Sequence, residues 1–141
     1  MSDLTAHFSL SEFKCKDGTE VPEEFIPRIE TLAVQLEQLR AHFGGVPIRI
    51  ISAYRNFEYN KRCGGAQPEV KDGTIVEGTG SQHLWARAVD ISVRGIDPKS
   101  VAEACADYQE SGDWIMGGVG CYPNHGFTHI DTRGNRARWT G

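Results

Sequence analysis

The sequence predicts an α+β fold in which a small antiparallel sheet is flanked by helices. Three observations support this prediction. Apolar residues recur every three or four positions over one long segment, several short segments are β-branched or alternating, and the last two of these are joined by a short turn. Helical and extended segments do not alternate regularly, which argues against a parallel βαβ sheet. The 141 residues have the length of one domain, so we expect a single domain over residues 1–141.

The first two elements follow from an apolar period and a β-branched run. Apolar residues share one face of a predicted helix that runs from about Pro22 or Pro27 to Phe43, and both prolines suit a first helical turn. Two glycines follow this helix as a stop signal. Residues 46–52 (VPIRIIS) lie between these glycines and a polar loop and are predicted to form a strand.

The middle of the chain predicts a short helix, a hairpin and a second strand. Residues 57–62 favour a short helix that ends at two glycines. Residues 67–80 are polar, and their VKDGTIV core is typical of a hairpin that turns at Asp72–Gly73. We expect this hairpin to be a surface insertion. Residues 87–93 alternate around three β-branched positions and predict a strand.

A third helix and a pair of strands complete the chain. Asp97 and Pro98 supply an N-cap and a first helical residue for a helix that ends near Glu110. Residues 117–123 and 127–131 predict two strands that are joined by a turn. This last pair is the reason for expecting an antiparallel sheet.

Composition excludes several classes of protein. The net charge of −4 leaves no general positive field that would attract a nucleic-acid backbone. No apolar run approaches the roughly 18 residues that a membrane span needs, and the first residues lack the pattern of a signal peptide. We therefore expect no nucleic-acid partner, no membrane span and synthesis in the cytoplasm without a signal peptide.

The four cysteines contain no Cys-x-x-Cys pair, which argues against a zinc knuckle or a thioredoxin-type motif. We expect reduced and mostly buried thiols. Pairing of Cys15 with Cys63 stays open for a protein that meets an oxidising compartment.

Two histidines and an aspartate form a possible metal site. His83, Asp90 and His129 would supply two imidazole nitrogens and one carboxylate, a donor set that suits Zn²⁺ and leaves a fourth position for water. This spacing alone is a weak signal. It gains weight because Asp90 lies among β-branched residues of a predicted strand, where an unpaired carboxylate is unfavourable. In the last predicted strand, the period of two puts Asp131 on the same face as His129.

Five blocks of sequence carry a family resemblance. They are, in order, residues 7–13 (HFSLSEF), residues 52–55 (SAYR), Asn60 with residues 64–66 (GGA), residues 81–90 (SQHLWARAVD), and residues 117–133 with Arg138 and Trp139. Together they resemble the zinc D-Ala-D-Ala carboxypeptidase family, peptidase family M15, and within it the small branch found in murein hydrolases and phage or prophage proteins. The resemblance implies a hedgehog/D-Ala-D-Ala-peptidase-like α+β fold and a zinc ion held by His83, Asp90 and His129.

The resemblance also implies roles for residues around the metal. Arg55 inherits the role of binding substrate or stabilising developing charge, and Tyr54, Ser81 and Gln82 are expected to contact substrate. Several branches of the family place an acidic proton acceptor three residues before the last ligand, a position that is glycine here. Asp131 and, as its rival, His125 are the expected proton acceptors, and Asp131 could instead orient a ligand.

Two further departures from the family pattern concern backbone and cleft. Ala86 stands where the family has glycine, which is tolerable if the backbone there has a negative φ. The insertion at residues 67–80 separates two blocks that the family joins almost directly, and we expect it to add a flap near the cleft.

The function expected from this resemblance is zinc-dependent hydrolysis of a peptide bond in the stem or cross-bridge of peptidoglycan. The enzyme would be a murein endopeptidase or a D,D-carboxypeptidase, monomeric, and acting on the cell wall after release or from a phage virion. The alternative is a non-catalytic wall-binding or phage structural module that keeps the fold and the zinc, because a fold does not settle a function.

Overall fold

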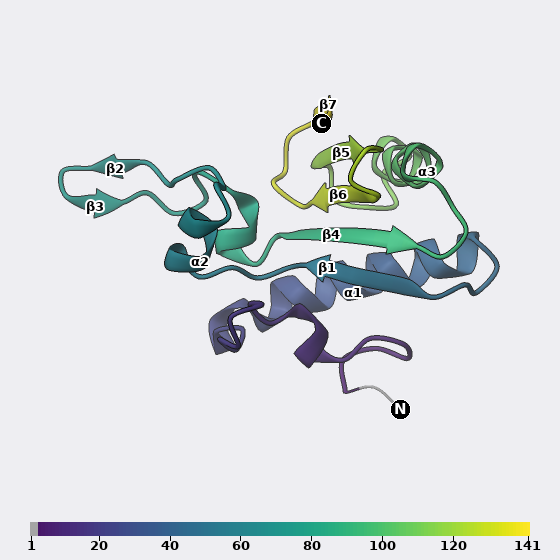
Figure 1. Cartoon of the computed structure of the whole chain (residues 1–141), viewed down its shortest axis with the longest axis horizontal. Helices are drawn as coiled ribbons and strands as arrows, with labels where there is room; N and C mark the ends of the chain where they lie inside the picture. Colours follow the sequence, from purple (N-terminus) through teal and green to yellow (C-terminus); the bar gives the residue numbers. More distant parts are fainter. Residues whose placement is uncertain (1–2) are drawn as a thin grey trace.

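The computed structural model describes residues 3–141 as a five-stranded sheet with helices packed on one face and a separate two-stranded hairpin that projects from the body (Figure 1). The α-helices are α1 (Ile26–His42), α2 (Phe57–Arg62) and α3 (Pro98–Glu110). Short 3-10 helices are η1 (Leu10–Phe13), η2 (Glu23–Phe25) and η3 (Gln82–Trp85). The strands are β1 (Ile48–Ser52), β2 (Val70–Lys71), β3 (Thr74–Ile75), β4 (Ala88–Val93), β5 (Gly118–Tyr122), β6 (Phe127–Asp131) and β7 (Ala137–Thr140).

The main sheet has the strand order β1-β4-β6-β5-β7, and all neighbours are antiparallel except β5 and β7. The predicted α+β class is therefore confirmed, and the strands and helices expected from the sequence are present. The sequence did not predict β7, which makes the sheet mixed. Trp139 and Thr140 favour strands, but a run of two such residues is too short to predict one, and β7 is defined by its parallel pairing with β5.

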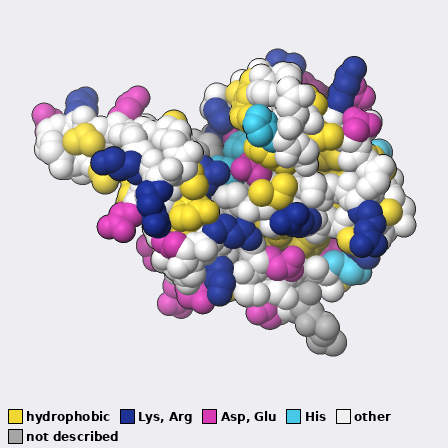
Figure 2. Space-filling view, viewed as in Figure 1, with side chains coloured by type: hydrophobic (Ala, Val, Ile, Leu, Met, Phe, Trp, Pro, Cys, Tyr) yellow, Lys and Arg dark blue, Asp and Glu magenta, His cyan; other side chains and the backbone are white. Residues whose placement is uncertain are grey.

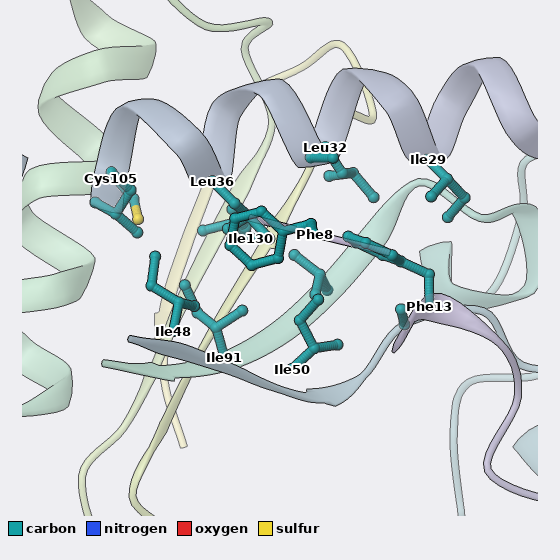
Figure 3. Packing of buried hydrophobic residues seen from close by; sticks show 14 of the residues in the cluster. Phe8, Phe13, Ile29, Leu32, Leu36, Ile48, Ile50, Ile91, Cys105 and Ile130 are labelled. Carbon is teal, nitrogen blue, oxygen red and sulfur yellow. The ribbon is translucent and has the colours of Figure 1, made fainter. Parts of the chain in front are cut away.

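The core lies between the sheet and the α1 and α3 helices. Figure 3 shows Leu32 and Leu36 of α1 facing Ile50, Ile91 and Ile130 of the sheet, and all five side chains are buried. Phe8 and Phe13 of the N-terminal segment close the same cluster. This packing follows from the apolar period of α1, which gives the helix one continuous face to bury.

Strand alternation separates this core from a second face of the sheet. In β6, Thr128 and Ile130 face the helices, and the Thr128 hydroxyl donates a hydrogen bond to the Pro98 carbonyl at the start of α3. Side chains at the alternate positions, His129 and Asp131 among them, must then lie on the opposite face. The helices leave that face free for a binding site.

The predicted hairpin over residues 67–80 is confirmed. It turns at Asp72 and Gly73, which both have positive φ (52° and 76°), as a two-residue hairpin turn requires. All four residues of β2 and β3 are exposed, and the hairpin points away from the body (Figure 1).

Two further sequence expectations concern cysteines and membrane spans. All four cysteines are free. Cys15 and Cys105 are buried, whereas Cys63 is exposed, so the Cys15–Cys63 bond is not formed. Over residues 3–141, none of the helices combines the length and the apolar character that crossing a membrane demands.

Candidate metal centre

A row of directly paired residues crosses the free face of the sheet. Asp90 of β4 pairs with His129 of β6, His129 with Gly120 of β5, and Gly120 with Trp139 of β7. Residues in register on neighbouring strands project from the same face. The row therefore brings a carboxylate, an imidazole and an indole together, although they are far apart in sequence.

His83 completes a three-residue cluster with Asp90 and His129. Its Nε2 atom lies 3.3 Å from Asp90 Oδ2, and His129 Nδ1 lies 2.9 Å from Asp90 Oδ1. All three side chains are buried, and one potential ligand atom from each lies within 4.8 Å of the others. Within residues 3–141, this is the group whose side chains converge in a way that could hold a metal ion.

The tautomer of His83 is fixed by the backbone. Its Nδ1 atom lies 2.6 Å from the carbonyl oxygen of Ala53. Because a carbonyl can only accept a hydrogen bond, Nδ1 carries the proton and Nε2 keeps its lone pair toward Asp90. Nearby, Ser81 caps η3 by accepting a hydrogen bond from the His83 amide, and this contact helps to place the imidazole.

His129 is oriented by Asp131. Its Nε2 atom lies 2.7 Å from Asp131 Oδ2, so Nδ1 is the nitrogen that faces the other two members of the cluster. The Asp131 carboxylate also accepts hydrogen bonds from the Gly118 amide and from the guanidinium of Arg133, through Nε at 2.9 Å and Nη2 at 2.7 Å. Both oxygens of this buried carboxylate are therefore already engaged by groups of the chain.

Burial and hydrogen bonding oppose one another at these groups. Burial lowers the pKa of His83, which favours the neutral imidazole that a metal requires. Burial alone would raise the pKa of Asp90 and of Asp131, but hydrogen bonds from His129 to both carboxylates, and from Arg133 to Asp131, outweigh it and hold each pKa well below its usual value. At His129, burial is outweighed by the bonds to Asp131 and Asp90, which raise its pKa.

The donor set fits a metal ion. Two imidazole nitrogens and one carboxylate are ligands that Zn²⁺ accepts, and three protein ligands leave one tetrahedral position open. Each imidazole also has its second nitrogen held by an oxygen acceptor, Ala53 O for His83 and Asp131 for His129, an arrangement typical of histidines that bind metals.

The cluster lies in a cleft of about 390 Å³. Figure 2 shows histidine and acidic side chains in the hollow between the hairpin and the body of the molecule. One wall is aromatic, since the rings of Tyr122 and Phe127 stack at 4.4 Å and the indole of Trp139 donates a hydrogen bond to the Tyr122 hydroxyl. The other wall is polar and contains the following residues: Arg55, Ala66, Gly80, Ser81 and Gln82.

Trp139 can reach the cleft because the β5 residue that lies between Trp139 and His129 in the row is a glycine, Gly120. The indole crosses Gly120 and lies 5.2 Å from the His129 ring, measured between ring centroids. A β-carbon on Gly120 would overlap the indole. Gly118, two residues before it on the same face of the strand, makes the same kind of room for the Asp131 carboxylate.

The structure brings most of the predicted substrate-binding residues to the cleft, but not Tyr54. Arg55, Ser81 and Gln82 line it, whereas Tyr54 is only 8% exposed and packs its ring edgewise against Phe25 in the core. Tyr54 and Arg55 are neighbours in an extended segment, so their side chains point to opposite sides. The sequence expectation for Tyr54 therefore needs correction.

The two predicted proton acceptors occupy very different places. Asp131 is buried behind His129, with its oxygens bonded as described above. His125 is exposed in the β5–β6 turn, and its ring lies edge-on to Tyr122 and Phe127, each 6.4 Å away between centroids. It therefore packs beside two residues of the aromatic wall, although it is not itself among the residues that line the cleft.

The backbone at Ala86 does not have the negative φ that would make alanine readily tolerable in place of glycine. Its φ is +57°, in the left-handed region, where it ends η3 as a C-cap. Alanine keeps the conformation that glycine adopts readily, and it does so while fully buried directly after the segment that carries His83.

Sequence reasoning gave no role to three residues that shape the cleft. Arg133 and Trp139 were noted only as parts of a motif, yet both line the cleft, and Trp139 lies in the strand that was not expected. Asn60 is fully buried, and its side-chain amide donates a hydrogen bond to the Ala66 carbonyl and accepts one from Arg55 at 3.5 Å. A polar residue in the last turn of a short helix next to two glycines was the available signal for Asn60.

Comparison with known proteins adds a family match. The sequence model of a family described as Peptidase M15 matches residues 6–131, a segment that includes all three members of the cluster. No curated protein sequence matches the chain. Arg133 and Trp139 lie beyond the matched segment.

Proposed function

The chain belongs to the peptidase M15 family, and from this premise we propose that it is a zinc-dependent peptidase that hydrolyses a peptide bond of peptidoglycan, in the stem peptide or the cross-bridge. The observation that carries this proposal is the convergence of His83 Nε2, Asp90 and His129 Nδ1 at the floor of an open cleft. The residues present suit a metal whose remaining coordination position is reached from that cleft.

In this proposal His83, Asp90 and His129 hold the zinc ion. When bound, zinc supplies a Lewis acid that polarises the scissile carbonyl and activates water. The chain keeps the ligands in place: the Ala53 carbonyl holds the proton on His83 Nδ1, and Asp131 holds the proton on His129 Nε2. Neither histidine then has to change tautomer when the metal binds.

Arg55 is proposed to stabilise negative charge that develops on the carbonyl oxygen of the scissile bond. Its guanidinium lines the cleft directly beside Asp90, with Nη2 3.6 Å from Asp90 Oδ2. The hydroxyl of Ser52 and the side chain of Asn60 hold this guanidinium from behind. A fixed cation beside the reacting carbonyl stabilises the transition state more effectively than a mobile one.

For proton transfer, the contacts favour different roles for Asp131 and His125. A base must have a lone pair that reaches the water or the leaving amine, and the Asp131 oxygens face His129, Arg133 and Gly118 instead. We propose that Asp131 orients His129 and that His125, beside Tyr122 and Phe127 of the aromatic wall, accepts the proton and passes it to the amine.

The proposed substrate fits the form of the cleft. The site is open to the surface, so an extended peptide can pass across it. Ser81 and Gln82 offer polar groups on one side, and the aromatic wall offers an apolar surface on the other. A non-catalytic wall-binding module remains the second candidate, since the same fold and ligands would serve it. The open cleft around three ligands, with charged and titratable groups at its edge, favours the enzyme.

The experiment is to incubate zinc-loaded protein with purified peptidoglycan and to measure newly released amino groups. We expect release that a chelator abolishes and added zinc restores, and mass spectrometry of the soluble fragments identifies the bond. His129→Ala should be inactive, whereas His7→Ala, a histidine paired with Glu37 outside the cleft, should keep full activity. Adsorption to peptidoglycan without any release of amino groups would favour the wall-binding module instead.

A further inference from the structure

Arg133 is held from two sides in a way that leaves part of it facing the cleft. One edge of its guanidinium makes a paired hydrogen bond to Asp131, from Nε to Oδ1 and from Nη2 to Oδ2. Its face lies over the Trp139 ring, 5.4 Å from the ring centroid. Two anchors of this kind fix the orientation of a side chain that would otherwise have several rotatable bonds.

The remaining nitrogen of Arg133 has no partner of its own. Within the part of the chain that the structure describes, no hydrogen bond or ion pair involves Nη1, and Arg133 lines the cleft. Arg55 differs, because each of its three nitrogens already faces a chain group: Ser52 at 3.1 Å, Asn60 at 3.5 Å and Asp90 at 3.6 Å. Of the two cleft arginines, Arg133 is the one with a terminal nitrogen that faces no group of the chain.

The position of Arg133 relative to the metal ligands indicates what this donor can reach. His129 faces His83 and Asp90 through Nδ1, whereas Asp131 and Arg133 follow on its Nε2 side. Arg133 therefore lies beyond His129 as seen from the ligand cluster. The scissile carbonyl has to approach the ligand cluster. A substrate group that binds Nη1 therefore lies some distance from the scissile bond.

We propose that Arg133 binds a carboxylate of the substrate at a distance from the scissile bond. The substrate class is then a peptide with a free carboxylate, either at its C-terminus or on a side chain. This inference rests on the proposed peptidase function. A guanidinium whose geometry is already fixed offers a charge-assisted hydrogen bond to a carboxylate with little further loss of freedom.

The experiment compares peptides that differ only in charge at one carboxylate. The probes are a peptidoglycan stem peptide that ends in D-Ala-D-Ala and versions in which one carboxylate at a time is a carboxamide. For the wild-type protein, one of these amides should raise KM by about 10- to 100-fold with little change in kcat, because a charged hydrogen bond is lost. This measurement needs no mutation.

Variants then connect the effect to Arg133. Arg133→Gln should raise KM for the parent peptide to about the value for the carboxamide peptide, so that the preference for the carboxylate is lost. Arg133→Lys should restore part of this preference. Arg136→Gln removes an arginine that is paired with Glu110 outside the cleft, so the preference should be unchanged. Zinc content and thermal unfolding show that each variant is folded and loaded.

The outcomes separate three cases. If Arg133→Gln lowers kcat equally for parent and amide peptides, Arg133 only supports Asp131, and the inference is wrong. If the wild type hydrolyses all peptides equally, the peptidase function stands and the inference fails. If nothing is hydrolysed, calorimetric Kd values for the same peptides decide. A carboxylate preference that Arg133→Gln removes supports the inference without the enzyme activity, and equal or absent binding overturns it.

Discussion

Two of the antiparallel strand pairs, β4–β6 and β2–β3, differ in almost everything except the direction of their pairing. The β4–β6 pair lies inside the main sheet, is buried almost throughout and carries Asp90, His129 and Asp131. The β2–β3 pair has two residues on each strand, all of them exposed, and stands away from the body (Figure 1). The difference shows how ligand atoms become fixed: strands that are paired on both edges and packed on the core leave each side chain few alternatives.

The two regions meet at the base of the hairpin. The Trp85 indole donates a hydrogen bond to the Thr79 carbonyl, and the Ser81 amide donates one to the Ala66 carbonyl. A β-carbon on Gly80 would overlap the backbone of Gln67. From residues 67–80, only Gly80 lines the cleft, so the expected flap touches the cleft at its base and not with its strands.

The largest effect is expected from removing a ligand within the β4–β6 pair. His129→Ala takes away one of three ligands, so zinc content should fall from about one ion per chain to near zero. His7→Ala is the matched control and should keep its zinc. Metal analysis of protein purified without chelator measures both. Unchanged zinc in His129→Ala would mean that the cluster is not the metal site.

The next prediction separates orientation of a ligand from proton transfer. Asp131→Asn should weaken zinc affinity by about 10- to 100-fold, because the amide holds the proton of His129 less strongly and leaves Arg133 without its charged partner. His125→Ala should keep zinc while kcat falls by about 10² to 10⁴. Competition with a chromophoric chelator and steady-state rates measure the two effects. Full zinc affinity with lost activity in Asp131→Asn would identify Asp131 as the proton acceptor.

A third prediction concerns the hairpin alone. Replacing residues 69–78 by a short Gly-containing turn, with Ala66, Thr79 and Gly80 retained, should change the free energy of unfolding by less than about 1 kcal/mol. Zinc content and turnover of soluble stem peptides should stay the same, whereas turnover of intact peptidoglycan should change. Denaturant unfolding and the ratio of the two activities test this. An unchanged ratio would reject a role of the hairpin in substrate choice.

The smallest effect compares the two non-glycine residues with positive φ, one just before β4 and one in the hairpin turn. Ala86 (φ +57°) is buried behind the metal cluster, and Asp72 (φ +52°) is exposed in the hairpin turn. Ala86→Gly should raise the free energy of unfolding by about 0.5 kcal/mol, since relief of the left-handed backbone exceeds the loss of one buried methyl group. Asp72→Gly should change it less, because aspartate tolerates this conformation and local opening of the hairpin is separate from global unfolding. Thermal unfolding of both variants makes the comparison, and a destabilised Ala86→Gly would show that the methyl packing dominates.

The period of the sequence predicted much of this arrangement. Alternation in residues 127–131 placed His129 and Asp131 on one face, and the structure has them there. Alternation could not show which imidazole nitrogen faces which carboxylate, because that depends on Arg133 and Gly118 from outside the strand. The Tyr54 expectation failed for a related reason, since a motif names adjacent residues but only the fold decides which of them points into the cleft. Strand β7 was missed because its strand-favouring run is only two residues long, and the pairing with β5 that defines it comes from a distant part of the chain.

The glycines of β5 have a consequence for how this protein can evolve. Gly118 and Gly120 contribute no reactive atom, yet the space above each is filled by a side chain from another strand, Asp131 and Trp139 respectively. A saturation mutagenesis survey should therefore find these two positions as intolerant as the metal ligands themselves. Even the smallest replacement, alanine, would displace a neighbour of His129. Substitutions in this strand are thus limited by the residues that lie over it. We expect related proteins with different substrate preferences to keep the Gly-x-Gly spacing.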